Sequence, residues 1–168
     1  MLASGVAVPW ALRAQELLAN DWGVSADVWS VTSWNELRRD AVRAEEWNLL
    51  NPGEEPKIPY VTQKLADAPG PVVAVSDWVK AVPDLLAPFV PGGMASLGTD
   101  GFGLSDTRPA LRRHFRVDAE SIVVRTLASL AQRGDIQRDV VRQAVEKYQI
   151  GDEQKAPEER RTDDHPAT

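Results

Sequence analysis

The densest group of glycine and small polar residues in the chain is the segment SLGTDGFGLSDTR, Ser96 to Arg108. Glycines at 98, 101 and 103 would let the backbone turn sharply or approach a ligand closely. Their G-x-x-G-x-G spacing differs from the dinucleotide fingerprint G-x-G-x-x-G, and no lysine follows as in a P-loop. Three interpretations stay open: a turn packed at a domain interface, the entrance of an active site, or an independent ligand site.

We expect this loop to follow a strand and to precede a helix. Ligands sit at the carboxyl ends of strands in parallel α/β sheets, and free N–H groups at the start of the helix could hold an anion. In the simpler interpretation the glycines supply positive φ at a corner, while Ser105, Asp106 or Thr107 caps the helix. The candidate residues of an interface or active-site-entrance loop are Gly98, Thr99, Asp100, Gly101, Phe102, Gly103, Ser105 and Asp106.

A further polar candidate is His114, in the segment RRHF of a predicted helix. It could carry protons or contact a substrate, or it could be a partly exposed histidine whose protonation the adjacent arginines disfavour. The only other histidine is His165, which gives little support for a hydrolase triad or a histidine-rich metal site. Cysteine is absent, which excludes disulfides and thiolate metal sites.

Hydrophobic periodicity predicts the elements that position these residues. Apolar residues at helical spacing indicate helices, and short β-branched runs indicate strands. We expect helices over residues 8–21, 33–50, 60–66, 106–115, 118–133 and 136–149, and a short or proline-kinked helix over 78–90. Strands are expected over residues 26–33, 71–77 and 94–98.

Side chains that cap helices support these boundaries. Ser33 and Glu36 form a capping box, and Asp118 and Asp135 stand where the last two helices are expected to begin. Gly23 is suited to a left-handed helix end.

Alternation of strands and helices predicts an α/β fold with a mainly parallel sheet of about four to five strands and helices on both faces. Only Met1–Ala3 precedes Ser4, so we expect a truncated first strand. Residues 1–150 are expected to form one domain. Residues 151–168 contain no large apolar side chain and are expected to form an acidic, disordered tail.

Tryptophan is frequent, with six residues in the chain. Trp29 lies in a predicted strand among apolar neighbours, so we expect it in the core. Trp34 and Trp78 stand at strand-to-helix junctions, where they could belong to the core or to a surface that other domains cover.

Charged residues alternate in sign along the predicted helix over 33–50. Two interpretations stay open, a solvated face with i, i+4 pairs or a contact with a neighbouring domain or subunit. The residues concerned are Arg38, Arg39, Asp40, Arg43, Glu45 and Glu46.

Composition narrows the class of protein. The chain has 168 residues, 43% hydrophobic and 26% charged, with a net charge of −6. This acidic balance argues against a nucleic-acid partner, because phosphate binding depends on clustered Lys and Arg. No apolar run approaches the roughly 20 residues that span a bilayer, and the N-terminus lacks the basic start of a signal peptide. We therefore expect a cytoplasmic chain without a membrane partner.

Several long segments carry a family resemblance: DVWSVTSWNELRRDA, EEWNLLNPGEEPKIPYVTQKL, GPVVAVSDWVK, LGTDGFGLSDTRPALRRHFRVDAESIVV and LAQRGDI. Together they resemble, over about residues 3 to 150, the C-terminal domain of the homodimeric bacterial pyruvate dehydrogenase decarboxylating component. The resemblance implies a transketolase-like α/β domain. It also implies that the first two domains of the full enzyme bind thiamine diphosphate and Mg²⁺.

The implied activity is that of the full enzyme, which decarboxylates pyruvate and transfers an acetyl group to a lipoyl group of its acyltransferase. The third domain would brace the dimer, so its implied partners are the remaining domains, a second subunit and, indirectly, the acyltransferase. No Gly-Asp-Gly metal motif occurs here, so we expect this chain alone to be inactive, with no catalytic, cofactor-binding or metal-binding residue.

The chain also departs from the family pattern. Leu104 follows GFG where the family commonly has arginine, and Pro9 and Trp10 replace a usual charged pair. Together with the truncated first strand, these departures fit a fragment, a divergent paralogue or a protein whose upstream portion is encoded elsewhere. Two alternatives therefore stay open, a free-standing truncated paralogue that acts as a protein-interaction module, and a small-ligand α/β domain that uses the Gly98–Gly103 loop.

Overall fold

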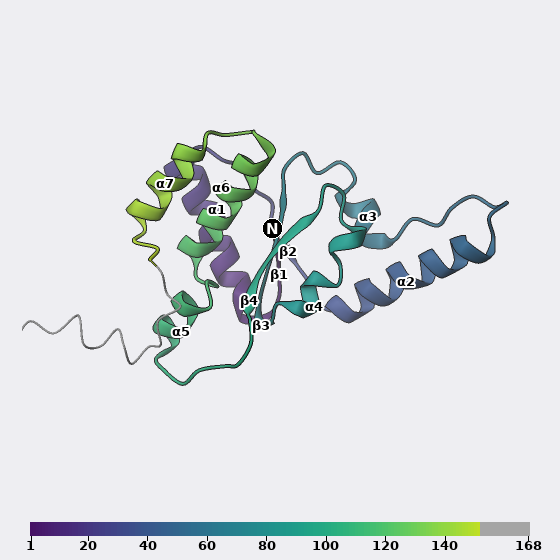
Figure 1. Cartoon of the computed structure of the whole chain (residues 1–168), viewed down its shortest axis with the longest axis horizontal. Coiled ribbons are helices and arrows are strands. Elements are labelled where there is room, and N and C mark those ends of the chain that lie inside the picture. Colours follow the sequence, from purple (N-terminus) through teal and green to yellow (C-terminus); the bar gives the residue numbers. More distant parts are fainter. Residues whose placement is uncertain (152–168) are drawn as a thin grey trace, which may run out of the picture.

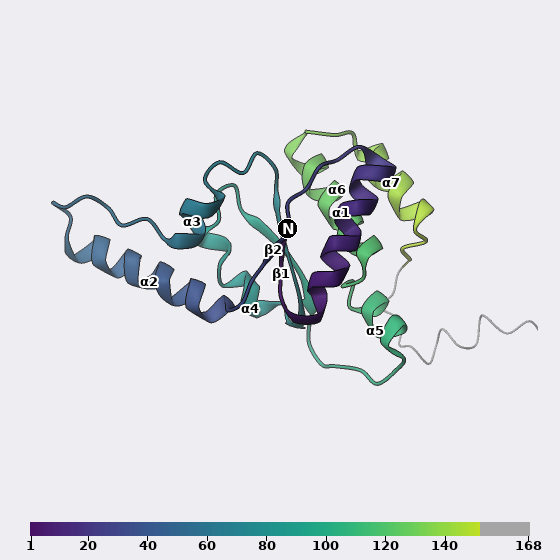
Figure 2. The ribbon, with the colours of Figure 1, turned by 180° about the vertical axis from the view of Figure 1, so that it is seen from behind.

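The structure is a computed structural model that describes residues 1–151. The tail expected over residues 151–168 lies outside the described residues, except for Gly151. A parallel sheet separates two groups of helices, with α1, α5, α6 and α7 on one side and α2, α3 and α4 on the other (Figures 1 and 2). This arrangement confirms the α/β fold with helices on both faces of the sheet.

The sheet of the described residues has four strands in the order β2-β1-β3-β4, all parallel. The shortest strands are β1 (Leu2–Ala3) and β2 (Trp29–Ser30), and the longer ones are β3 (Val72–Val79) and β4 (Met94–Thr99). Although β1 has two residues, it lies inside the sheet. Its Leu2 is in register with Trp29 on one side and with Ala74 on the other.

Seven α-helices and two 3₁₀ turns complete residues 1–151. The α-helices are α1 (Val8–Trp22), α2 (Trp34–Leu50), α3 (Tyr60–Leu65), α4 (Ala81–Asp84), α5 (Arg108–His114), α6 (Ala119–Arg133) and α7 (Arg138–Lys147). The 3₁₀ turns are η1 (Gly5–Ala7) and η2 (Ala87–Phe89). The prolines of the segment 78–90 have the expected effect, since a long helix is replaced by α4 and η2. None of the helices in this part of the chain is long and apolar enough to cross a membrane.

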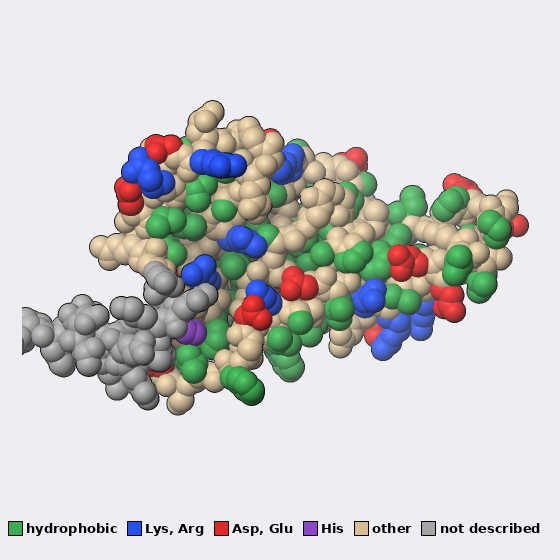
Figure 3. All heavy atoms as spheres, viewed as in Figure 1, with side chains coloured by type: hydrophobic (Ala, Val, Ile, Leu, Met, Phe, Trp, Pro, Cys, Tyr) green, Lys and Arg blue, Asp and Glu red, His purple; other side chains and the backbone are tan. Residues whose placement is uncertain are grey.

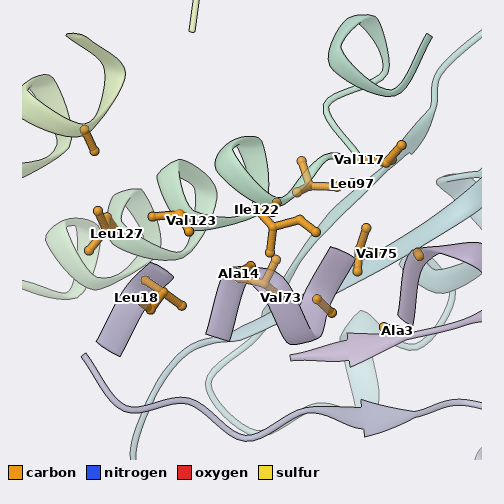
Figure 4. Close-up of a cluster of buried hydrophobic side chains, with 14 residues drawn as sticks. Ala3, Ala14, Leu18, Val73, Val75, Leu97, Val117, Ile122, Val123 and Leu127 are labelled. Carbon is orange, nitrogen blue, oxygen red and sulfur yellow. The ribbon is translucent and has the colours of Figure 1, made fainter. Parts of the chain in front are cut away.

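Strand β3 is buried on both faces, which explains its nearly continuous apolar sequence. Val73 and Val75 point to one core, which α1 and α6 cover, whereas Val72 and Ala74 point to the other, which α2 and α3 cover. Figure 4 shows side chains of the first core, with Leu18 of α1 and Leu127 of α6 between the two helices. Alternate side chains of one strand therefore hold both helix layers.

The predicted helix ends are largely confirmed. The Ser33 hydroxyl accepts a hydrogen bond from the backbone N–H of Glu36 at 3.2 Å, and the Asp118 carboxylate accepts one from that of Ser121 at 2.9 Å. Gly23 ends α1 in the left-handed region with φ 64°. Local side-chain chemistry thus determines where these helices begin and end.

The prediction that Asp135 caps the last helix is wrong. Helix α7 follows Gln137, which makes no side-chain cap, and the Asp135 carboxylate instead pairs with Arg133 at 3.1 Å. Three residues separate the left-handed Gly134, which ends α6, from Arg138, the first residue of α7. A nearby arginine competes successfully for the carboxylate.

The prediction that Trp29 lies in the core is also wrong, because its side chain is 45% exposed. Strand β2 is a two-residue edge strand with one neighbour, so the sheet covers it incompletely. The two junction tryptophans diverge: Trp34 is buried in the second core, and Trp78 is exposed.

A polar contact joins the end of α1 to the end of α7. The Tyr148 hydroxyl donates to Asp21 at 2.6 Å and accepts from the Trp22 indole N–H at 3.0 Å. Burial, followed by the bond to Asp21, raises the pKa of Tyr148 to about 12. The bonds from Tyr148 and Lys147 lower the pKa of the Asp21 carboxyl.

We predict that Tyr148→Phe lowers the free energy of unfolding by about 1 kcal/mol at neutral pH, because the Trp22 N–H loses its acceptor. A raised folded-state pKa stabilises the fold fully below pH 10, and this contribution is lost as the pH rises to about 12. The difference between wild type and Tyr148→Phe should therefore shrink between pH 10 and 12. Urea denaturation of both proteins at pH 7, 10 and 12 measures this difference in the free energy of unfolding.

The matched control is Tyr60→Phe, at an exposed tyrosine of α3, which should leave stability unchanged. Equal stability of wild type and Tyr148→Phe at pH 7, or a difference that grows between pH 10 and 12, would contradict the prediction.

Candidate functional site

The candidate loop leaves the sheet where β4 ends, at the carboxyl edge of the parallel strands. Thr99 is the last residue of β4, and Arg108 is the first of α5. Residues 100–107 span the gap as a long connection at one end of the molecule (Figure 1). The expected order of strand, loop and helix is therefore present, at the edge of the sheet where such folds carry their sites.

The three glycines of the loop differ in whether the structure requires glycine at their position. Gly101 has a φ of 85°, which other residues rarely adopt. Gly98 lies where β3 departs from regular register, and a Cβ there would stand 2.7 Å from the carbonyl oxygen of Trp78 and 3.1 Å from that of Ser76. Gly103 has neither constraint. The expectation of positive φ thus holds for Gly101 alone, and Gly98 is needed for close backbone approach.

The expected side-chain cap of α5 is wrong. Thr107 occupies the cap position with extended backbone, but its hydroxyl makes no cap hydrogen bond. Asp106 accepts a hydrogen bond from the N–H of Thr107 at 2.6 Å, one residue too early to cap the helix. Ser105 makes no cap either. Pro109 in the first turn reduces the need for a cap, since it has no N–H to satisfy.

A cavity of about 770 Å³ opens beside the loop, between β4, α5 and the flank of α6. Of the sequence candidates, Gly98, Asp100, Phe102 and His114 line it, together with the family departure Leu104. The remaining loop candidates do not line it: Thr99, Gly101, Gly103, Ser105 and Asp106. The fold therefore brings His114 to the same space as one part of the glycine loop.

Ionic and aromatic contacts organise the wall of the cavity. The Lys80 ammonium pairs with the Asp100 carboxylate, and the backbone N–H of Lys80 donates to the carbonyl of Thr99 at 2.9 Å. The ring of His114 meets that of Phe115 edge to face, with centroids 4.9 Å apart. The two contacts of Lys80 tie the end of β4 to the segment after β3. Phe102 is 95% exposed at the tip of the loop.

Sequence reasoning missed most of the polar lining. The missed residues are Lys80, Ser96, Arg116, Ser121 and Arg125. Helical spacing gave a usable signal for two of them, because positions 121 and 125 are one turn apart and face the same side of α6. Nothing local indicated that Ser96 and Lys80 would face that same helix.

A second polar group ties α2 to the carboxyl edge of the sheet. The Trp34 indole N–H donates to the Ser4 hydroxyl at 2.9 Å, and that hydroxyl donates to Ser76 at 3.3 Å. The Ser76 hydroxyl in turn accepts from the N–H of Trp78 at 3.1 Å. This chain of hydrogen bonds gives Trp34 a structural role, because it links α2 to β3. It also holds the end of β3 where the strand departs from regular register.

The second half of α2 and the loop after it, residues 45–59, project from the body of the molecule (Figures 1 and 2). We refer to them as the arm. Asn48 and Lys57 hold the arm together, because the Asn48 side chain accepts from the Lys57 N–H at 2.7 Å and donates to the Lys57 carbonyl at 2.9 Å. The Lys57 ammonium also lies 4.3 Å from the centre of the Trp47 ring. These contacts thus hold the two segments of the arm against each other.

The charged residues of α2 are only partly a solvated face. Arg39 is exposed and pairs with Glu36, three residues before it, instead of at i+4. Arg38 is half-buried, with its guanidinium 5.5 Å from the centre of the Phe89 ring, so it also packs on the core. Arg43, Glu45 and Glu46 are exposed.

Comparison with known proteins yields one family and several relatives. A family model described as the transketolase-like TK C-terminal domain matches residues 1–118. The chain is 59% identical to a pyruvate dehydrogenase E1 component of Mycolicibacterium smegmatis over 152 residues, 90% of this chain and 16% of the relative. It is 55% identical to the protein of that name in Mycobacterium tuberculosis, over 95% of this chain and 17% of the relative.

A third relative, the pyruvate dehydrogenase E1 component of Escherichia coli K12, is 46% identical over 89% of this chain and 17% of the relative. The chain therefore spans about one sixth of the length of these relatives.

Two alanine substitutions in the loop should differ in their effect on stability, because the space around Gly98 and Gly103 differs. Gly98→Ala should lower the free energy of unfolding by about 1–3 kcal/mol, because the new Cβ meets backbone atoms that cannot move aside cheaply. Gly103→Ala, with open space around its Cβ, should change it by less than about 0.5 kcal/mol. Chemical denaturation compares the two. A Gly98→Ala variant as stable as Gly103→Ala would refute the role given to Gly98.

Proposed function

This chain belongs to the transketolase-like C-terminal domain family and matches that domain of pyruvate dehydrogenase E1 components, and on this basis we propose that it serves such an enzyme as a structural domain. The full enzyme would use thiamine diphosphate and Mg²⁺ to decarboxylate pyruvate and pass acetyl to a lipoyl acyltransferase in the cytoplasm. The domain would brace the homodimer and position the catalytic domains, without contributing groups to the reaction.

The observation that carries this proposal is the arm. Its apolar side chains Leu49, Leu50 and Ile58 are exposed, with Leu49 at 79%, although polar contacts keep the arm ordered. Figure 3 shows hydrophobic side chains on the projecting part of the surface. An ordered projection with uncovered leucines is typical of an interface, because exposed apolar patches commonly mark binding sites.

The occupant that we propose for the arm is the rest of an E1 chain, in the same or the second subunit. The relatives are about six times as long as this chain, so most of such an enzyme lies outside it. Trp78, exposed near the carboxyl edge of the sheet, would extend the same contact. Aromatic residues of this kind frequently anchor interfaces.

The described residues do not fit the metal-diphosphate part of the cofactor. No group of three or more His, Cys, Asp or Glu side chains within residues 1–151 is placed to hold a metal ion. Mg²⁺ requires oxygen ligands, and Asp100, the one carboxylate that residues 1–151 contribute to the cavity lining, is already paired with Lys80. We therefore assign no catalytic step to this domain.

The proposal predicts that this domain works in the context of an E1 chain. A chimera in which residues 1–150 replace the matching segment of the M. smegmatis relative should release CO₂ from pyruvate, and the isolated chain with thiamine diphosphate and Mg²⁺ should release none. Leu49→Asp combined with Leu50→Asp should lower the activity of the chimera about tenfold or more, because the charges oppose burial of the arm.

The matched control is Leu12→Asp, which adds a charge at an exposed leucine of α1 outside the arm and should retain activity. Light scattering of each chimera reports whether activity and assembly are lost together. Release of CO₂ by the isolated chain, or full activity and unchanged mass in the Leu49→Asp, Leu50→Asp chimera, would overturn the proposal.

A further inference from the structure

The cavity beside β4 and α6 contains buried polar atoms that no residue of the described chain satisfies. They are the hydroxyls of Ser96 and Ser121 and the Nε of Arg125, and all three residues line this one cavity. Buried polar atoms in proteins are nearly always hydrogen-bonded. Three unsatisfied donors around one space therefore indicate that something is to be bound there.

Ser121 is the most telling of the three, since its residue is 4% exposed. Other hydroxyls of α6 satisfy themselves on the preceding turn: that of Thr126 donates to the carbonyl of Ile122 at 2.8 Å, and that of Ser129 to the carbonyl of Arg125 at 3.1 Å. Ser121 makes no such bond. The buried hydroxyl of Ser121 is thus unpaired in a residue that lines the cavity.

The charge of the lining favours an anion. Arg116 and Arg125 line the cavity, and neither has a salt-bridge partner among residues 1–151. The carboxylate of Asp100 is paired with Lys80 and so does not neutralise them. Figure 3 shows Lys and Arg side chains near the histidine on this face, although the chain as a whole is acidic. The lining of the cavity therefore carries an excess of positive charge.

Apart from His114, the rest of the lining is apolar. Phe102, Leu104 and Phe115 contribute aromatic and aliphatic surface near the loop, and Val124 contributes it from α6. The volume of about 770 Å³ lies within the roughly 300–1,000 Å³ of small-molecule sites. Such sites combine mostly apolar walls with a few convergent polar groups, which is the composition found here.

We propose that this cavity binds a small organic oxyanion with an apolar or aromatic body. Arg125, Ser96 and Ser121 would donate hydrogen bonds to the oxyanion, since an arginine and neighbouring hydroxyls suit phosphate or carboxylate oxygens. Phe102 and Leu104 would contact the apolar body. The site is separate from the arm and does not depend on the function proposed above.

Calorimetric titration of the full 168-residue chain with phenyl phosphate, benzoate, inorganic phosphate and phenol tests the proposal. We expect saturable one-to-one binding of phenyl phosphate or benzoate. Inorganic phosphate, which lacks the aromatic body, and phenol, which lacks the oxyanion, should bind more weakly. The tighter of the two aromatic anions identifies the oxyanion as phosphate or carboxylate. Absence of saturable binding by both aromatic anions, or equally tight binding of phenol, overturns the proposal.

Matched variants locate the binding. Arg125→Gln should weaken it about tenfold or more, whereas Arg138→Gln, an equal loss of charge at an exposed position of α7, should leave it unchanged. Leu104→Glu adds a carboxylate to the lining at a partly exposed position and should also weaken binding, with Leu12→Glu on α1 as its control. Because position 104 is in a surface loop, this pair remains informative if Arg125→Gln does not fold.

The proposal fails if the members of either pair behave alike. Amide chemical shifts give an independent map, and changes should concentrate at Ser96, Ser121 and Arg125. Shifts confined to other parts of the chain would place the ligand elsewhere and overturn the assignment.

Discussion

The two-sided burial of β3 is the constraint on which the rest of this structure depends. Val73 and Val75 hold α1 and α6 on one face, and Val72 and Ala74 hold the opposite helices on the other. At its carboxyl end the strand departs from regular register, so that its carbonyls approach β4 at Gly98. The position of the loop, and hence of the cavity, follows from this irregularity. The same strand thus packs the core and positions the candidate site.

Much of the fold could be predicted because the deciding signals are local. Helical periodicity and the caps at Ser33 and Asp118 are properties of short segments, and the apolar run of β3 requires cover on both faces. The errors came from tertiary context. Trp29 has the sequence setting of a core residue, but its strand lies at an edge, and Asp135 has the right type for a cap but pairs with Arg133. Sequence pattern does not reveal which neighbours compete for a side chain.

In the candidate site, too, features of short segments could be predicted and contacts between distant segments could not. The glycine loop was identified from its composition, and the fold does place its Gly98, Asp100 and Phe102 at a cavity. The unsatisfied polar groups of that cavity come from β4 and α6, which meet only after the chain has folded. The first part of the arm was predicted as the end of a helix over residues 33–50 with mixed charge, but the contact of Asn48 with Lys57, nine residues later, was not. Contacts between residues far apart in the sequence cannot be predicted from the spacing of residues within one segment.

The account rests on the arm as a preformed surface for the rest of an E1 chain. The most direct measurement is site-specific photo-crosslinking in the M. smegmatis chimera, with the crosslinker at Leu49 on the arm or at the exposed Gln143 of α7. The account predicts efficient crosslinks from position 49 to segments of E1 outside this domain, and few or none from position 143. Absence of crosslinks from position 49 in the assembled, active chimera would contradict it.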